Sequence, residues 1–130
     1  MNFLLDTHAL LWISNNSKEL SKRLKKDFEN RENDFFISIA SLWEMTIKIS
    51  LKKLELPCSL EKYVKTEVVQ NGIKILPISL KHLALLEELP FHHRDPFDRL
   101  IITQAITEDL TIYSKDKIFS RYDVALKWRT

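Results

Sequence analysis

The chain has 130 residues, of which 45% are hydrophobic and 29% are charged, and this composition is typical of one globular domain. The 20 Lys and Arg residues nearly balance 18 Asp and Glu residues, and the formal charge of +2 excludes a polycationic tail. The single cysteine, Cys58, excludes an internal disulfide and a cysteine-rich zinc site, and it favours a reducing compartment. We therefore expect one domain over residues 1–130.

The apolar segments are too short for a membrane span, which needs about 20 apolar residues. Asp6 interrupts the apolar start of the chain, which argues against a signal peptide, so we expect a cytoplasmic protein. The single glycine, Gly72, excludes the glycine-rich phosphate loops of P-loop and Rossmann proteins.

Short apolar runs alternate with longer helical patterns along the chain. In chain order, we expect a strand over Asn2–Leu5, a helix from Thr7, a charged amphipathic stretch over Ser17–Asn30, a strand over Asp34–Ser38 and a helix over Ile39–Leu51. After Pro57, we expect a helix from Ser59 to Gln70, a strand over Ile73–Leu76, helices over Ser79–Leu89 and Asp95–Glu108, a strand over Leu110–Tyr113, a short turn of helix over Lys117–Arg121 and an edge strand over Val124–Lys127.

Helices of about 10 to 15 residues between strands predict crossover connections, and hence a mostly parallel sheet with helices on both faces. The runs FLL and FFI are apolar without alternation, which is typical of strands buried on both faces. The fold class predicted from the pattern is therefore α/β.

Four acidic residues lie near the ends of predicted elements. Asp6 ends the first strand, Glu44 lies one or two turns beyond the second, Asp98 opens the helix before the fourth, and Asp116 follows the fourth. Ligands of parallel sheets bind beyond the carboxyl ends of the strands, so we expect these side chains to converge on one cleft. Two carboxylates about 4 Å apart repel by about 4 kcal/mol at an effective dielectric of 20, which favours either protonation or a bound cation. Oxygen ligands favour Mg²⁺ or Mn²⁺.

Each acidic residue also has a purely structural interpretation. Glu44 can pair with Lys48 one helical turn away, and the remaining carboxylates can cap helices. The possible helix caps are Asp6, Asp95, Asp98 and Asp116.

The histidines and tryptophans are ambiguous. His8, His82, His92 and His93 lack the spacing of zinc ligands, and we expect His92 and His93 in the loop before the Asp95–Glu108 helix. The helix Ile39–Leu51 is apolar on more than one face. Its Trp43, together with Trp12, belongs either to the core or to a surface that a second chain covers.

Four segments carry a resemblance to a known family: FLLDTHALLW, ISIASLWEMTIK, HHRDPFDRLIITQA and IYSKDKIF. In this order and spacing, the chain resembles PIN-domain ribonucleases over essentially its whole length, and in particular the VapC-like toxins of type II toxin–antitoxin pairs. The resemblance implies a three-layer α/β/α fold with about five strands in the order 3-2-1-4-5. It also implies that the acidic residues of the family correspond to Asp6, Glu44, Asp98 and Asp116.

The implied activity is Mg²⁺- or Mn²⁺-dependent endonucleolytic cleavage of RNA by metal-activated water, which leaves a 5′-phosphate and a 3′-hydroxyl. Asp6 and Asp98 would hold the metal, with Glu44 and Asp116 in or near its coordination shell, and one or two ions remain open. Three further residues are expected to support the site: Asp95, as a helix cap or a metal contact, Ser114, which positions ligand or water, and Arg99, which orients Asp98.

The resemblance further implies an RNA substrate and a cognate antitoxin. The surplus apolar surface around Trp43 and Trp12 predicts a homodimer, and the short apolar segments predict no membrane association. An antitoxin Arg or Lys among the carboxylates would inhibit by charge. The basic residues expected to contact RNA are Arg94, Arg99, Lys115, Lys48 and Lys52.

Other functions were weighed against this one. A phosphatase of the haloacid-dehalogenase type needs a second aspartate where His8 stands, and the segment Ser114–Asp116 fits a phosphorylated receiver domain poorly. An inactive PIN-like module that binds protein or RNA is the principal alternative, although it gains nothing from four repelling carboxylates.

Overall fold

A computed structural model describes residues 1–18 and 20–127, and it contains a five-stranded sheet in the order β3-β2-β1-β4-β5. All four strand pairings are parallel. The strands are β1 (Asn2–Leu5), β2 (Asp34–Ser38), β3 (Lys74–Leu76), β4 (Thr111–Tyr113) and β5 (Leu126–Lys127). The α-helices are α1 (Thr7–Ser14), α2 (Lys22–Glu29), α3 (Ile39–Ser50), α4 (Leu60–Tyr63), α5 (Leu80–Glu88) and α6 (Pro96–Glu108), with a π-helical segment η1 (Val64–Val69) and a 3₁₀-helix η2 (Lys117–Arg121).

The strand order confirms the predicted topology, with β1 at the centre of the sheet. Phe3 lies opposite Phe35 of β2, and Leu4 lies opposite Ile112 of β4. Because successive side chains of a strand point to opposite faces, Phe3 and Leu5 enter one core and Leu4 enters the other. Burial on both faces explains why this strand is apolar without alternation.

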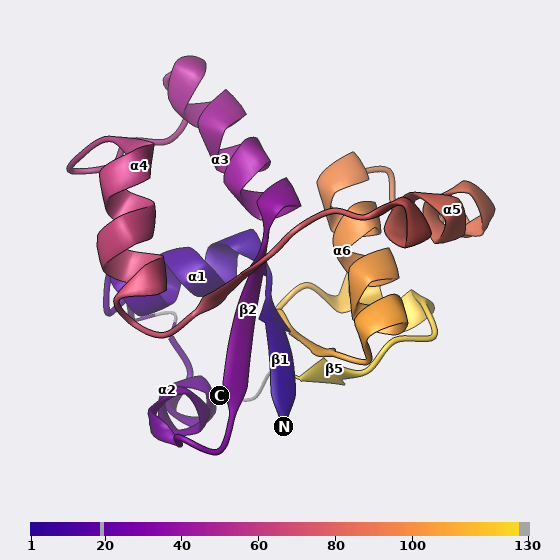
Figure 1. Cartoon of the computed structure of the whole chain (residues 1–130), viewed down its shortest axis with the longest axis horizontal. Helices are drawn as coiled ribbons and strands as arrows, with labels where there is room; N and C mark the ends of the chain where they lie inside the picture. Colours follow the sequence, from indigo (N-terminus) through magenta and orange to yellow (C-terminus); the bar gives the residue numbers. More distant parts are fainter. Residues whose placement is uncertain (19, 128–130) are drawn as a thin grey trace.

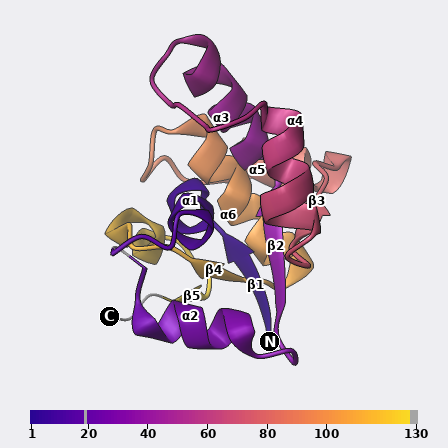
Figure 2. The ribbon, with the colours of Figure 1, turned by 90° about the vertical axis from the view of Figure 1, so that its left-hand side faces the viewer.

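Helices cover both faces of the sheet, so the molecule has three layers. In Figure 1, α1, α2 and α4 lie to the left of the strands, and α5 and α6 lie to the right. Figure 2 shows the same sheet turned by 90°, with α2 beneath the strands. The first core contains Leu10 of α1, Leu24 of α2 and Met45 of α3, and the second contains Ile101 and Ile102 of α6. The predicted α/β/α fold is confirmed.

Several boundaries differ from the prediction. The charged stretch becomes helical only at Lys22, because the Ser21 hydroxyl caps α2 by accepting a hydrogen bond from the Leu24 amide. The helix capped by Ser59 widens to η1 after Tyr63. There the Thr66 hydroxyl donates to the Lys62 carbonyl, the acceptor that a regular α-helix reserves for a backbone amide. The third and fifth strands are shorter than expected.

The connections place several chain segments at the carboxyl ends of the strands. Asp6 separates β1 from α1 directly, and α3 begins at the residue after β2. The segment from Ser114 to Asp116 follows β4 and leads into η2. Within the described residues, no helix is long and apolar enough to cross a lipid bilayer.

Candidate metal centre

Asp6 lies at the end of the central strand and is 6% exposed. Its Oδ1 accepts a hydrogen bond from the Ala9 amide at 2.7 Å, so Asp6 caps α1 as one interpretation predicted. Its Oδ2 accepts a hydrogen bond from the Ser114 hydroxyl at 2.5 Å. Burial raises the pKa of Asp6, the two hydrogen bonds only partly offset this, and the charge of Asp116 raises it further. The Asp6 carboxylate therefore both caps α1 and belongs to the candidate metal centre.

Glu44 points from α3 into the same region and is 8% exposed. Its Oε1 accepts a hydrogen bond from the Thr7 hydroxyl at 2.8 Å, and its Oε2 lies 3.0 Å from Lys48 Nζ. The predicted helical pair with Lys48 is thus present. Although Glu44 is paired with Lys48, it also lies close enough to Asp98 for its charge to help raise the pKa of Asp98.

Asp98 lies in the first turn of α6, and its pKa is raised to about 7 by burial, by Asp95 and by Glu44, with His93 acting in the opposite direction. Asp95 is the N-cap of this helix, as predicted, and accepts hydrogen bonds from the amides of Phe97 and Asp98. The capping acid therefore also adds negative charge beside Asp98.

His93 bridges Asp95 and Asp98. The Asp95 amide donates to His93 Nδ1 at 3.3 Å, and His93 Nε2 lies 2.9 Å from Asp98 Oδ2. Because Nδ1 accepts a hydrogen bond, a neutral ring carries its hydrogen on Nε2 and donates it to the carboxylate. His93 thus fixes the orientation of Asp98.

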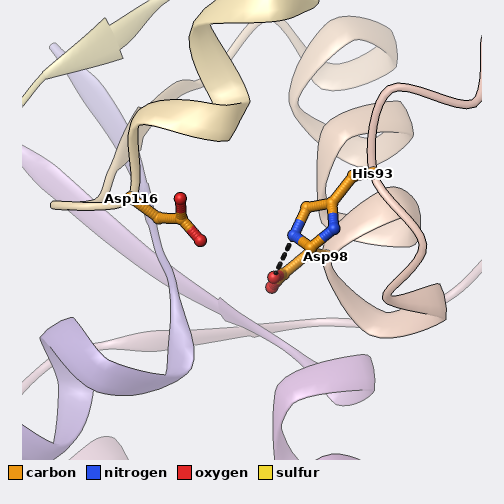
Figure 3. A group of neighbouring side chains, drawn as sticks. All are labelled: His93, Asp98 and Asp116. Carbon is orange, nitrogen blue, oxygen red and sulfur yellow. Dashed lines mark hydrogen bonds and ion pairs between the residues drawn. The ribbon is translucent and has the colours of Figure 1, made fainter.

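Asp116 completes the group from the segment after β4. It is exposed and caps η2, since its Oδ1 accepts a hydrogen bond from the Ile118 amide. One ligand atom from each of His93, Asp98 and Asp116 lies within 4.8 Å of the others. Figure 3 shows the Asp116 carboxylate facing Asp98 across a gap, with His93 hydrogen-bonded to Asp98.

The predicted acids are therefore grouped around one region. Asp98 and Asp116 each place an oxygen within 4.8 Å of the other. Asp6 lies close enough to Asp116 for its pKa to be affected by that charge, and Asp98 is affected in the same way by Glu44. Burial is the main cause of the raised pKa values of Asp6 and Asp98, and the neighbouring carboxylates add to it. Carboxylate oxygens grouped in this way fit a divalent cation such as Mg²⁺ or Mn²⁺.

The PIN domain family model matches residues 3–125. The chain belongs to the PIN domain family. No curated protein matches the sequence. Among solved structures, the chain is similar to VapBC2 from Rickettsia felis bound to a promoter DNA fragment, with a TM-score of 0.72, 21% identity and coverage of 98% of each chain. It is also similar to FitAcB from Neisseria gonorrhoeae, with a TM-score of 0.67, 20% identity and coverage of 95% of each chain. A third similar structure is DNA-bound VapBC from Salmonella typhimurium, with a TM-score of 0.68 and 15% identity, covering 98% of this chain and 97% of that chain.

Ser114 holds two of the acids of this PIN domain in place. Its side chain is almost fully buried, its hydroxyl donates to Asp6, and its oxygen accepts a hydrogen bond from the Asp116 amide at 3.0 Å. It therefore links the ends of β1 and β4, and its expected role in positioning ligand or water stays a prediction.

Arg99 does not have the predicted role. Its guanidinium is buried and donates to the carbonyls of Pro90 and Leu89 at 2.9 and 3.2 Å, and it stacks on the Phe91 ring at 3.9 Å. Successive helical residues point about 100° apart, so adjacency to Asp98 in sequence does not bring the two side chains together. Arg99 instead secures the loop before α6.

The other predicted basic residues are dispersed. Lys48 is held by Glu44, and Lys52 lines a separate pocket beside Leu54 and Cys58. Arg94 is exposed in the loop before α6, and Lys115 is exposed next to Asp116. Lys48 and Lys115 are thus the predicted RNA-binding residues that lie beside carboxylates of the cluster.

Two residues of the site were not predicted. Thr7 was considered only as part of a helix start, yet it holds Glu44. His93 was placed correctly in the loop before α6, but its contact with Asp98 was not foreseen. The loop folds back because the Tyr122 hydroxyl accepts a hydrogen bond from the His93 amide and donates to the Pro90 carbonyl. No local sequence pattern reports that tertiary contact.

Proposed function

We propose that this PIN domain is a Mg²⁺- or Mn²⁺-dependent endoribonuclease and the toxin of a type II toxin–antitoxin pair. The observation that carries the proposal is the convergence of Asp6, Glu44, Asp98 and Asp116, from four separate segments, at the carboxyl edge of the sheet. The same edge is where parallel sheets bind ligands.

Asp98, Asp116 and Asp6 are the residues that we propose hold the metal, with Glu44 beside them. A divalent ion at this place would neutralise the carboxylates and an attacked phosphate, and it would lower the pKa of a coordinated water. The surrounding donors fix where each carboxylate oxygen lies: Ser114 holds Asp6, Thr7 and Lys48 hold Glu44, and His93 holds Asp98 Oδ2. Preorganisation of this kind reduces the cost of assembling the site when substrate binds.

Cleavage of RNA by the purified chain tests the activity. With Mg²⁺, we expect internal cuts that leave a 5′-phosphate and a 3′-hydroxyl, and we expect no cuts with EDTA or in Asp6→Asn. If the wild-type chain binds RNA but leaves it intact under all metal conditions, the inactive binding module is the better description.

The proposal includes an antitoxin and a homodimer. The similar structures from Rickettsia felis and Salmonella typhimurium are VapBC complexes, which supports a partner of the antitoxin type for this chain. On α3, Leu42 and Met45 are buried, whereas Trp43 is 56% exposed and contacts the Phe97 ring edge-on at 5.0 Å. We propose that a second copy or the antitoxin covers Trp43.

Trp43→Glu tests this surface. Because Trp43 is exposed, the variant should keep its melting temperature within a few degrees while dimer or antitoxin affinity falls, as measured by light scattering and by antitoxin titration. Unchanged association in the folded variant would exclude Trp43 from the interface. Loss of folding would instead place it in the core.

A further inference from the structure

A shallow pocket adjoins the carboxylate cluster and has no part in the chemistry described above. Its volume is about 290 Å³, and it is lined by Asp6, His8, Trp12, Lys115 and Asp116. Two of these residues belong to the proposed metal centre. The other three supply two aromatic rings and a cation, so the pocket has an acidic wall and an aromatic, basic wall.

The aromatic wall comes from α1. His8 and Trp12 are one helical turn apart, their ring centroids lie 5.7 Å apart, and their planes are inclined by only 27°. The helix that carries them is fixed at its start, where the Ala9 amide bonds to Asp6 and the Thr7 hydroxyl bonds to Glu44. The stacked rings therefore stand at a set position relative to the carboxylates.

The cation is Lys115, which follows β4. Its Nζ lies 5.9 Å from the centroid of the Trp12 ring. Its two neighbours in sequence belong to the site, since Ser114 holds Asp6 and Asp116 faces Asp98. A positive charge therefore lies near the Trp12 ring, on the residue that precedes Asp116 in sequence.

We propose that this pocket is a subsite for the nucleotide that flanks the cleaved phosphate, with its base against Trp12 and His8 and its phosphate near Lys115. This inference rests on the proposed endoribonuclease function, and it names residues that bind the substrate beside the metal centre. Aromatic faces next to cations are how proteins bind single-stranded nucleic acid, because every base offers a face for stacking. The pocket combines these two features beside a centre suited to a phosphodiester.

Steady-state cleavage of a single-stranded RNA by Trp12→Leu and Lys115→Met tests the subsite. We expect Trp12→Leu to raise KM about tenfold, equivalent to about 1.4 kcal/mol, with little change in kcat, because stacking binds substrate and transition state alike. Trp12→Phe should restore most of the affinity. Lys117→Met, which removes the same charge two residues further on from a side chain outside the pocket, should keep the wild-type KM.

A second readout does not depend on cleavage. RNA that carries 5-iodouridine, irradiated with the wild-type chain in EDTA, should cross-link to the peptide that contains His8 and Trp12. An unchanged KM in Trp12→Leu, or cross-links confined to other peptides, would overturn the subsite, as would a loss of antitoxin binding with an unaltered KM. If Trp12→Leu fails to fold, Lys115→Met and the cross-link decide the question.

Failure of the proposed function has a different signature. If the wild-type chain never cleaves RNA but the cross-link still falls on Trp12, the pocket binds nucleotides and the nuclease proposal is wrong. If the wild type cleaves RNA, but Trp12→Leu leaves KM unchanged and no cross-link forms with the Trp12 peptide, the subsite proposal alone is wrong.

Discussion

Asp98 and Asp27 are similarly buried aspartates with opposite environments. Their side chains are 20% and 14% exposed. Asp27, on α2, receives a hydrogen bond from the Tyr113 hydroxyl at 2.5 Å and lies 2.8 Å from Lys127 Nζ. Burial alone would raise the pKa of Asp27, but the hydrogen bonds and charge from Lys127 and Tyr113 lower it overall. For Asp98, burial, Asp95 and Glu44 raise the pKa to about 7, and His93 offsets this only in part.

The contrast separates an acid whose charge is compensated within the chain from one that we propose binds a metal ion. Asp27 ties α2 to β4 through the Tyr113 hydroxyl and to β5 through the cation of Lys127. For Asp98, burial and the charges of Asp95 and Glu44 outweigh the contribution of His93, so the ionised form is disfavoured in the folded protein. Perturbed carboxyl groups at a sheet edge are therefore evidence for a functional site.

Cleavage activity should separate the two aspartates most strongly. We expect Asp98→Asn to lower kcat by about 100-fold or more, beyond the range that loss of an outer-shell partner produces. The kcat of Asp27→Asn should stay within a few-fold of the wild-type value at a temperature where the variant is folded. Equal losses in the two variants would mean that folding, and not metal binding, explains the effect of Asp98.

The orientation of Asp98 by His93 should be visible in metal affinity. His93→Ala should raise the Mg²⁺ concentration needed for half-maximal cleavage by about 10- to 100-fold, because the carboxylate loses the donor that positions it. His93→Gln keeps a donor near the Nε2 position and should recover part of the affinity. His92→Ala is the matched control, since the exposed His92 packs against Tyr122. Metal dependence of the melting temperature gives a second measure, and equal loss in the Ala and Gln variants would refute the donor role.

Without metal, Asp27→Asn and Asp98→Asn should have opposite effects on the free energy of unfolding. Asp27→Asn should destabilise the fold by about 1.5–3 kcal/mol, the usual value of hydrogen bonds to a charged group. Asp98→Asn removes a repelling charge and should leave the protein in EDTA as stable as wild type or more so. Thermal and urea unfolding measure both effects. A marked loss of stability in Asp98→Asn would show that its place in the first turn of α6 matters more than repulsion.

As the pH rises, the contribution of Asp98 to stability should fall and that of Asp27 should increase. The pKa of Asp98 is raised above 3.8 to about 7, so the folded state holds its proton longer, and its contribution to stability is lost as pH rises through 7. The pKa of Asp27 is lowered, so its contribution is present above pH 3.8 and is lost as pH falls further. Urea unfolding in EDTA across pH 3–8 should therefore show a weaker decline towards pH 8 in Asp98→Asn and a weaker decline towards pH 3 in Asp27→Asn. Unaltered profiles would contradict these assignments.

Much of the fold was predictable because local patterns report it. The apolar run at Asn2–Leu5 reflects burial on two faces, and Asp6 stands where a parallel strand delivers its ligand-binding residue. Periodicity identified α3 and α6 almost to the residue. The sequence did not predict that α2 begins only at Lys22, which the Ser21 cap decides, or that η1 has π-helical geometry.

Side-chain direction was harder to predict than position. Arg99 follows Asp98 in sequence, but its guanidinium points towards the carbonyls of Leu89 and Pro90. His93 reaches Asp98 only because a loop is folded back by Tyr122, a residue 29 positions away from His93. Contacts of this kind depend on tertiary structure, and no spacing rule encodes them.

Mn²⁺ binding measured by calorimetry on the wild type, Asp98→Asn and Asp27→Asn tests most directly whether the acidic cluster is a metal centre. Wild type and Asp27→Asn should bind Mn²⁺ with the same stoichiometry and similar affinity, and Asp98→Asn should bind it at least about tenfold more weakly. Equal binding by wild type and Asp98→Asn, or no binding by the wild type, would contradict a metal site among these carboxylates.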